Sequence, residues 1–401
     1  MIESTGFGYS LLKFLIVLTV LVFVHEMGHY WVARRSGVRV EVFSIGFGPE
    51  IFGWTDSVGT RWKVSWLPLG GYVKFFGDMD VASRPDPSMT PEVQNVLRAS
   101  GDDSERDPAD PSMHLLTEEE KAVAFPYKNI WQRAAIVAAG PGANFLFAIV
   151  VFAGLFMTVG QPYTPAKVGT VEPNSAAAEA GILPGDKIIQ VGSTGIDRFE
   201  DLIQVISMSP GEKLKIVVER NGKDVTLTAT PKLVTDKDAF GDEHRIGRLG
   251  VGRVGVDYIK RGPLEAVGYA VVETGNTVKL ILKSIGQLIV GERSTDELRG
   301  PLTIAKMSGQ IAHTGFIDLV SFMALLSINL GLINLFPIPM LDGGHLLFYA
   351  FEAVRGRPLG LRAQEYGFRI GLVMVLFLMI QAIWNDFKSL SVFDYVSGLF
   401  S

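Results

Sequence analysis

Four stretches of the sequence are apolar over a long enough run to predict helices that cross a membrane. They occupy roughly residues 9–33, 134–160, 317–336 and 368–387. About 20 consecutive apolar residues are needed to span the hydrocarbon core of a bilayer, and each stretch approaches or exceeds that length. No small-x-small cleavage site follows the first stretch, so we interpret it as a retained helix and not as a signal peptide.

The third apolar stretch is interrupted. It continues to about residue 354, but Asn334, Pro337 and Pro339 fall inside it. Proline breaks a helix, and irregular backbone at membrane depth is tolerated where it faces protein or a water-filled cavity. The interruption therefore predicts a broken helix and hints at a functional site in the third span.

Basic residues gather at three boundaries of the predicted spans. They are Arg34, Arg35, Lys128, Arg133, Arg355, Arg357, Arg362 and Arg369. Loops on the cytoplasmic side carry an excess of Lys and Arg, so these boundaries are predicted to be cytoplasmic. Both termini and residues 161–316 would then lie on the outer, periplasmic side of the membrane.

The segment between the first two spans has two parts. Residues 38–76 alternate between hydrophobic and polar side chains, which predicts short strands with turns at glycines 46, 48, 53, 59, 70 and 71. We expect a membrane-associated β-hairpin region that, with the first helix, forms a unit of residues 1–80. Residues 81–130 are polar and rich in Pro and acidic residues, and we predict a mobile or partly helical cytoplasmic loop there.

After the second span, at residues 131–161, a soluble module is predicted at residues 162–236. Four short runs alternate as strands, two short helices lie between them, and Asn221-Gly222 marks a hairpin turn. The pattern predicts a compact mixed α/β domain. Residues 237–316 are predicted to be a linker and amphipathic helices, which lie along the outer membrane surface or pack on the module. Residues 317–401 hold the last two spans.

The amino-acid composition limits which residues could bind a metal and which partners are expected. The chain of 401 residues is 48% hydrophobic, has a formal net charge of −5 and contains no cysteine. The absence of cysteine excludes disulfides and thiolate metal sites, so a metal would rest on His, Asp and Glu. No basic stripe stands out, and nucleic acid is not an expected partner.

The first predicted span carries His25-Glu26-Met27-Gly28-His29. On a helix the two imidazoles share one face, one turn apart, and can bind one zinc ion. Catalytic zinc has three protein ligands and a water, and Glu26 is the candidate general base for that water. A polar contact between helices is the alternative, but it does not explain an unpaired Glu26 inside a membrane.

The candidate third ligand is Asp342, which lies just past the two prolines in the broken span. By chemistry alone His345 is a rival ligand. Asp342 could also serve as the N-cap of a restarting helix, or take both roles.

These motifs carry a resemblance to a known family. The HExxH of the first span and Asn334-x-x-Pro337-x-Pro339-x-Leu-Asp342-Gly-Gly of the third resemble the bacterial site-2 proteases, as do Gly140-Pro141-Gly-Ala-Asn144 and Gly70-Gly71. The resemblance implies that His25, His29 and Asp342 bind one Zn²⁺, that Glu26 is the base and that His345 is not a ligand. It also implies that Asn334, Pro337, Pro339, Gly70, Gly71 and Asn144 contribute to substrate binding.

The soluble module is similar to bacterial PDZ domains through residues 180–188, Ala-Gly-Ile-Leu-Pro-Gly-Asp-Lys-Ile. Such domains bind an extended chain end by strand addition. We place this pocket at Val168, Gly169 and Thr170. A domain that only blocks access to the membrane part is an equally good interpretation. Many relatives carry two such domains in tandem, and this chain has room for one.

The sequence thus predicts a polytopic α-helical membrane protein with about four transmembrane helices, a membrane-associated β-hairpin region and an inserted PDZ domain. We expect a zinc endopeptidase of the bacterial inner membrane with its active site near the cytoplasmic side. The resemblance implies transmembrane substrates such as anti-sigma factors and signal peptide remnants, cut in regulated intramembrane proteolysis. A silent membrane scaffold and a metal transporter are the competing classes. A transporter would predict repeated half-chains, and the sequence shows none.

Overall fold

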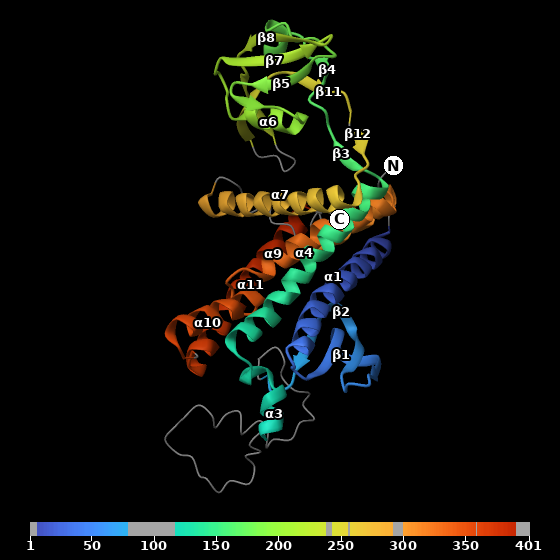
Figure 1. Ribbon diagram of the computed structural model, residues 1–401, viewed down its shortest axis with the longest axis vertical. Helices are drawn as coiled ribbons and strands as arrows, with labels where there is room; N and C mark the ends of the chain where they lie inside the picture. The colour runs from blue at the N-terminus through green and yellow to red at the C-terminus, as the bar shows by residue number, and fades with distance from the viewer. Residues whose placement is uncertain are drawn as a thin grey trace, which may run out of the picture. The chain divides into compact units, whose positions relative to one another are not determined.

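The computed structural model describes residues 6–78, 117–237, 243–255, 257–291, 300–357 and 359–389. The chain divides into two compact units, which are described separately. The first comprises residues 1–152, 270–283 and 298–401, and the second comprises residues 153–269 and 284–297. Figure 1 labels the main helices and strands of both units.

Long helices dominate the first unit (Figure 1). They are α1 (Phe7–Arg35), α4 (Ile130–Thr158), α9 (Phe316–Asn334), α10 (Asp342–Arg355) and α11 (Leu361–Ser389). Four of them, α1, α4, α9 and α11, are long and apolar enough to cross a membrane. These helices correspond to the four predicted spans and fit a polytopic membrane protein.

The predicted break in the third span is present. Helix α9 ends at Asn334 and α10 begins at Asp342, with residues 335–341 between them. Within this connection the Leu341 N–H donates to the carbonyl oxygen of Ile338 at 3.0 Å. The segment is therefore a turn between two helices, and it places Asp342 in the first turn of α10.

Residues 40–75 form two long strands, β1 (Val40–Thr55) and β2 (Arg61–Phe75), and not the predicted series of short ones. The strands are sharply bent, because residues 42–45 have partners both at 61–64 and at 71–74. The prediction that the glycines form turns is wrong for all but Gly59. Gly46 and Gly48, both with φ near +90°, lie inside β1, where they permit irregular register and bending.

A hydrophobic core joins the paired strands to three helices of the same unit. Phe43, Val73 and Phe75 pack with Ala33 of α1 and Ile136 of α4, and residues of α10 border this cluster. The cluster ties the strands to the helices that carry the candidate metal ligands.

The predicted polar loop of residues 81–130 lies outside the described residues up to residue 116. Its last part contains α3 (Glu118–Val123) and a short 3₁₀ turn, η2 (Phe125–Tyr127). Thr117 and Glu120 form a capping box at the start of α3, which explains why the helix begins there.

The second unit holds the mixed α/β module. Its main sheet has the order β6-β5-β7-β8, formed by β6 (Thr194–Gly195), β5 (Lys187–Val191), β7 (Leu214–Arg220) and β8 (Lys223–Ala229). The short helices are α5 (Ala176–Glu179) and α6 (Phe199–Ser207). Asn221 and Gly222 both have positive φ, as the two-residue hairpin turn between β7 and β8 requires.

Strand pairing in the second unit continues past residue 236. The additional pairs are β9 (Lys232–Lys237) with β10 (Glu243–Arg248), β11 (Val251–Arg253) with β4 (Val168–Val171), and β12 (Asp257–Ile259) with β3 (Gln161–Tyr163). Leu249, just before β11, is buried in the hydrophobic core of the module. The sequence pattern predicted β4 and missed the other five strands of these pairs, which are only three to six residues long.

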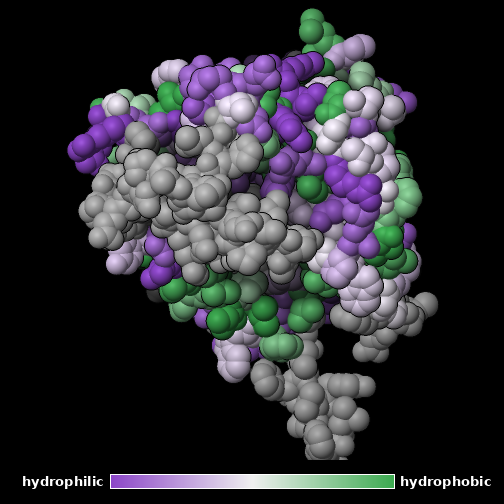
Figure 2. Space-filling view, turned by 90° about the horizontal axis from the view of Figure 1, so that it is seen from below, coloured by the Kyte–Doolittle hydropathy of each residue, from purple (hydrophilic) through white to green (hydrophobic). Residues whose placement is uncertain are grey.

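Two further helices follow, α7 (Pro263–Val290) and α8 (Pro301–Thr314). Helix α8 belongs to the first unit, where Asp386 of α11 accepts hydrogen bonds from the backbone N–H groups of Gly300 and Leu302, both at 2.9 Å. Helix α7 exposes Leu264, Ile289 and Val290, consistent with the predicted amphipathic surface helix. Exposed hydrophobic side chains are also visible as patches on the face shown in Figure 2.

A buried ion pair stabilises the α/β module. Asp186 is 1% exposed, and both of its carboxylate oxygens accept hydrogen bonds of 2.7 Å from Arg220. Arg220 holds the pKa of the Asp186 carboxyl below its ordinary value of 3.8. The pair therefore contributes its full stabilisation above that pH and loses it as the pH falls toward the lowered pKa.

We expect Asp186→Asn to speed hydrogen exchange of the β5 and β7 amides about tenfold at pH 7, because the module opens more often. The difference from wild type should shrink as the pH falls below 3.8, because the carboxyl is then protonated in the unfolded state, and it should be lost once the pH passes the lowered pKa of the folded state. Glu172→Gln is the matched control, since its ion pair with Arg248 is exposed and should change exchange less than about twofold. Equal effects of the two substitutions would contradict the role of the buried pair.

Candidate active site

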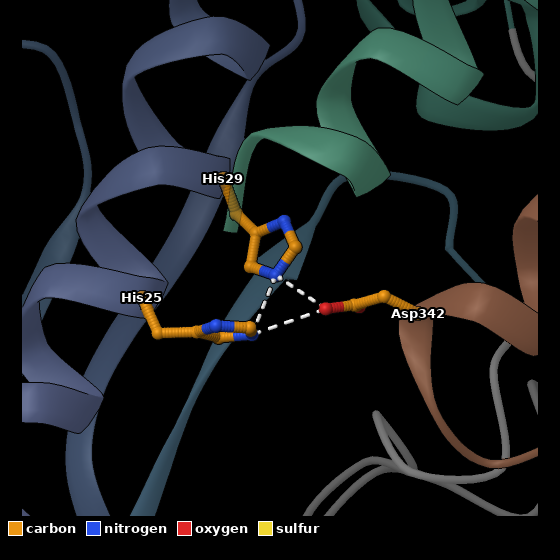
Figure 3. Close-up of side chains that lie close together, drawn as sticks. All are labelled: His25, His29 and Asp342. Carbon is orange, nitrogen blue, oxygen red and sulfur yellow. Dashed lines mark hydrogen bonds and ion pairs between the residues drawn. The ribbon is translucent and has the colours of Figure 1, made fainter. Parts of the chain in front are cut away.

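Three side chains from two helices converge inside the first unit. His25 and His29 project from α1 toward Asp342 of α10, as Figure 3 shows. The Nε2 atoms of the two histidines are 3.2 Å apart. Asp342 Oδ2 lies 3.1 Å from Nε2 of His25 and 3.5 Å from Nε2 of His29.

Glycines allow the helices that carry these residues to approach closely. A Cβ atom on Gly28 of α1 would overlap the carbonyl oxygen of Ala139 in α4. A Cβ atom on Gly140 of α4 would overlap the imidazole of His29. The absence of both side chains brings α4 directly against the two histidines.

Helix α4 also orients both imidazole rings. His29 Nδ1 lies 2.9 Å from the carbonyl oxygen of Ile136, which can only accept, so Nδ1 carries the proton. The neutral ring then has its lone pair on Nε2, the atom that faces His25 and Asp342. A ligand histidine in metal sites is commonly fixed in this way by a backbone carbonyl.

Asn144 of α4 is the partner of His25. Its amide is fully buried and lies 3.2 Å from His25 Nδ1 through Nδ2, while its Oδ1 has no hydrogen-bond partner among the described residues. Turning the amide over lets Oδ1 accept a hydrogen bond from the Nδ1–H of His25. His25 then also presents a lone pair on Nε2.

The three convergent atoms fit a metal ion. Two imidazole lone pairs and a carboxylate oxygen repel one another at this separation unless a cation lies between them. For a tetrahedral zinc ion with bonds of about 2.0–2.1 Å, the ligand atoms are separated by about 3.3–3.4 Å. The observed separations of 3.1, 3.2 and 3.5 Å bracket that value. A donor set of two nitrogens and one oxygen, without thiolate, is typical of catalytic zinc.

Glu26 lies beside this centre, toward the paired strands. Its carboxylate interacts electrostatically with His25, His29 and Asp342. A Cβ atom on Gly71 of β2 would lie 3.2 Å from Glu26 Cγ, so the backbone of β2 passes directly next to this side chain.

The structure bears on the N-cap role suggested for Asp342 and on the position of His345. Helix α10 begins at Asp342 itself, Leu341 occupies the N-cap position, and no side chain caps the helix, so the N-cap interpretation is wrong. His345 does not join the three convergent groups, and its ring lies 5.4 Å from that of Phe368 in α11.

The residues expected to bind substrate fall in three places. Asn334 is half-buried at the end of α9, with Pro337 exposed and Pro339 half-buried in the turn that follows. Gly70 and Gly71 lie in β2, where Gly70 has φ +138° and packs against the ring of Phe47. Asn144 contacts His25 instead, which the sequence did not indicate, because a contact between distant helices leaves no local pattern.

The residues of the predicted peptide pocket, Val168, Gly169 and Thr170, lie in the α/β module. These residues form β4, whose one edge pairs with β11. On its other edge, Val168 donates to the Asp186 carbonyl at 2.7 Å and accepts from the Gly185 N–H at 2.7 Å. Both edges are therefore occupied at Val168, and the peptide pocket at Val168, Gly169 and Thr170 stays a prediction.

Two histidines on a helix of membrane-spanning length and an aspartate on the shorter helix α10 fit zinc. They define a membrane metalloprotein with a hydrolytic type of site. Comparison with known sequences identifies its family. The profile of peptidase family M50 matches residues 13–378. The chain belongs to this family, and it is a zinc metalloprotease of the site-2 protease type.

Related proteins align with this chain over almost its whole length. Two proteins named as zinc metalloproteases, from Rhizobium meliloti and Agrobacterium fabrum, are each 44% identical to this chain. The alignments cover 94% and 96% of this chain and 96% and 98% of the respective relatives. Metalloprotease MmpA of Caulobacter vibrioides is 38% identical, over 99% of this chain and its own full length.

We expect Asn144→Ala to weaken zinc binding about 10- to 100-fold, because His25 loses the acceptor that fixes its tautomer and ring orientation. Zinc affinity of the purified protein, measured by competition with a chelator, tests this. Asn144→Asp keeps an acceptor oxygen and should bind zinc as tightly as wild type. An alanine variant with wild-type affinity would show that Asn144 does not orient His25.

Proposed function

We propose that the chain hydrolyses peptide bonds within transmembrane segments, with His25, His29 and Asp342 as zinc ligands and Glu26 as the general base. The observation that carries the proposal is the convergence of the three ligand atoms between α1 and α10. Helix α1 is long and apolar enough to cross a membrane. A charged site is costly inside a bilayer, which favours a catalytic purpose at membrane depth.

The chemistry divides between the metal and the chain. Bound zinc would supply a water of lowered pKa and polarise the scissile carbonyl. Glu26 accepts the proton of that water and delivers it to the leaving amine. Asn144 and the Ile136 carbonyl hold the two imidazoles so that their lone pairs stay aimed at the centre.

The paired strands are the proposed platform for the substrate. A helical peptide bond is shielded and hydrogen-bonded, so a substrate span must unwind before attack. The unwound segment would then add as a strand to the edge formed by residues 71–75, next to Glu26. Asn334, the last residue of α9, would hold the other side of the segment.

Substrates and location follow from the family resemblance. We propose anti-sigma factors and signal peptide remnants as substrates, in the inner membrane of a bacterium. The active site would face the cytoplasm, and the α/β module and both termini would be periplasmic. The module would act as a PDZ domain, either by binding a chain end or by limiting access to the membrane part.

We expect Glu26→Gln to abolish cleavage of a single-span substrate in liposomes while zinc content stays at the wild-type level, because only the proton carrier is lost. Mass spectrometry of the products and metal analysis test the two parts. Glu265→Gln on α7 is the control, since this exposed glutamate lies at the start of that helix. Normal cleavage by the Glu26 variant would refute the mechanism.

Cysteine cross-linking tests the substrate platform, because the natural chain contains no cysteine. In a Glu26→Gln background, Tyr72→Cys should form a disulfide with a cysteine near the scissile bond of the substrate. Trp54→Cys is the control, since residues 50–55 lie on the opposite edge of the paired strands. Cross-linking that is equal at both positions, or stronger at residue 54, would argue against strand addition at residues 71–75.

A further inference from the structure

The turn that precedes Asp342 has an unusual backbone. The Leu341 N–H donates to the carbonyl of Ile338, and Pro339 and Met340 occupy the two central positions. Met340 has φ +93°. A hydrogen-bonded turn with Pro second and a positive φ third is normally completed by Gly or Asn, so methionine is strained there. Strained backbone persists only where the surroundings hold it in place.

The first turn of α10 holds one side of this connection. A Cβ atom on Gly343 would overlap the carbonyl oxygens of Leu335 and Phe336, and one on Gly344 would lie 2.6 Å from Pro339 Cα. Both glycines are buried. The connection therefore folds back directly onto the helix that begins at Asp342.

Helix α11 holds the other side through Gly371. A Cβ atom on this residue would overlap the carbonyl oxygen of Pro339 and lie 2.6 Å from its carbonyl carbon. Gly371 is buried, although most of α11 is exposed; among its described residues, only Gly371, Asn385 and Asp386 are fully buried. Asn385 and Asp386 lie at the far end, where Asp386 caps α8.

We propose that Gly371 is a positioning residue for the third zinc ligand, an inference that rests on the proposed function of Asp342. The Pro339 carbonyl points out of the turn and needs a partner surface without a side chain. Gly371 provides that surface, which keeps Met340 in its left-handed conformation and Asp342 within reach of the two histidines. The last helix thus acts on the metal centre without contributing a ligand.

Association with another membrane helix is the other common use of such a glycine. Gly367 and Gly371 have the small-xxx-small spacing that mediates helix pairing in membranes. However, Gly371 is already covered by Pro339 of the same chain, and Gly367 contacts the ring of Phe348. The pair therefore packs against this chain's own turn.

Gly371→Ala tests the proposal without weakening α11, because alanine favours a helix more than glycine does. Gly367→Ala is the matched control, because the atom nearest to its Cβ would be Cζ of Phe348 at 2.9 Å, on a ring that can rotate. Pro339 Cγ would lie at 3.8 Å, in ordinary contact. Asp342→Ala serves as the reference for loss of a ligand. Three measurements are made on full-length protein: zinc affinity, the visible spectrum after cobalt substitution, and thermal unfolding of the metal-free form.

We expect Gly371→Ala to bind zinc at least tenfold more weakly and to change the cobalt spectrum, with metal-free unfolding as in wild type. Gly367→Ala should stay within about twofold of wild-type affinity. Wild-type affinity and spectrum in Gly371→Ala would overturn the inference, as would an equal loss in Gly367→Ala. A metal-free Gly371→Ala that is destabilised or fails to fold would also overturn it, because the contact would then be structural.

The reference variant separates this inference from the proposed function. If Asp342→Ala loses zinc affinity and Gly371→Ala does not, only the role of Gly371 is refuted. If Asp342→Ala binds zinc like wild type, the proposed ligand set itself is wrong.

Discussion

The structure of the membrane part depends on holding one carboxylate against two imidazoles. His25 and His29 come from the first helix, and Asp342 comes from a helix that starts far later in the sequence, yet their ligand atoms lie 3.1–3.5 Å apart. Without a cation these atoms repel one another, and with one they must stay within a few tenths of an ångström of their places. Much of the surrounding architecture serves that requirement.

The fold holds the ligand atoms in place through close approach between backbone segments. In a bilayer the hydrophobic effect does not drive helices together, so packing of small residues takes on this role. Gly28 and Gly140 bring α1 against α4, which then supplies the partners of both imidazoles. Gly343 and Gly344 press the connection after α9 onto α10. The glycines of these motifs thus act through contact distances, and their conformational freedom is secondary.

The sequence predicted the features that have a local pattern. Long apolar runs marked the four helices of spanning length, the prolines marked the break after Asn334, and the spacing of His25 and His29 marked a shared helix face. The sequence did not predict features that depend on contacts between segments far apart in the chain. Strand β11 is only three residues long and is recognisable only through its pairing with β4. The glycines of β1 and β2 resembled turns because bends inside a strand and turns between strands favour the same residue.

Asn144 is an example within the site of a contact between distant segments that the sequence did not predict. Its motif suggested a role toward the substrate, but a neutral amide that is fully buried beside His25 has a more direct use. The two imidazoles need different acceptors because α4 passes them at different points. His29 meets a backbone carbonyl, since Gly140 leaves space for its ring, whereas His25 meets a side chain. Residue type alone does not distinguish an amide that orients a metal-binding histidine from one that contacts the substrate.

The position of Gly71 links the metal centre to the paired strands. A side chain at this residue would meet Ser44 of β1 and Val22 and Glu26 of α1 at 2.7–3.2 Å, so the strand backbone lies against the helix that carries Glu26. Residues 71–74 pair with residues 42–45 on one side only. A segment added to the free side would run parallel or antiparallel to a rigid strand whose position is set by the hydrophobic core beneath it. Glu26 and the strand edge are therefore held next to each other by the same packing, as the proposed cleavage of an unwound substrate segment would require.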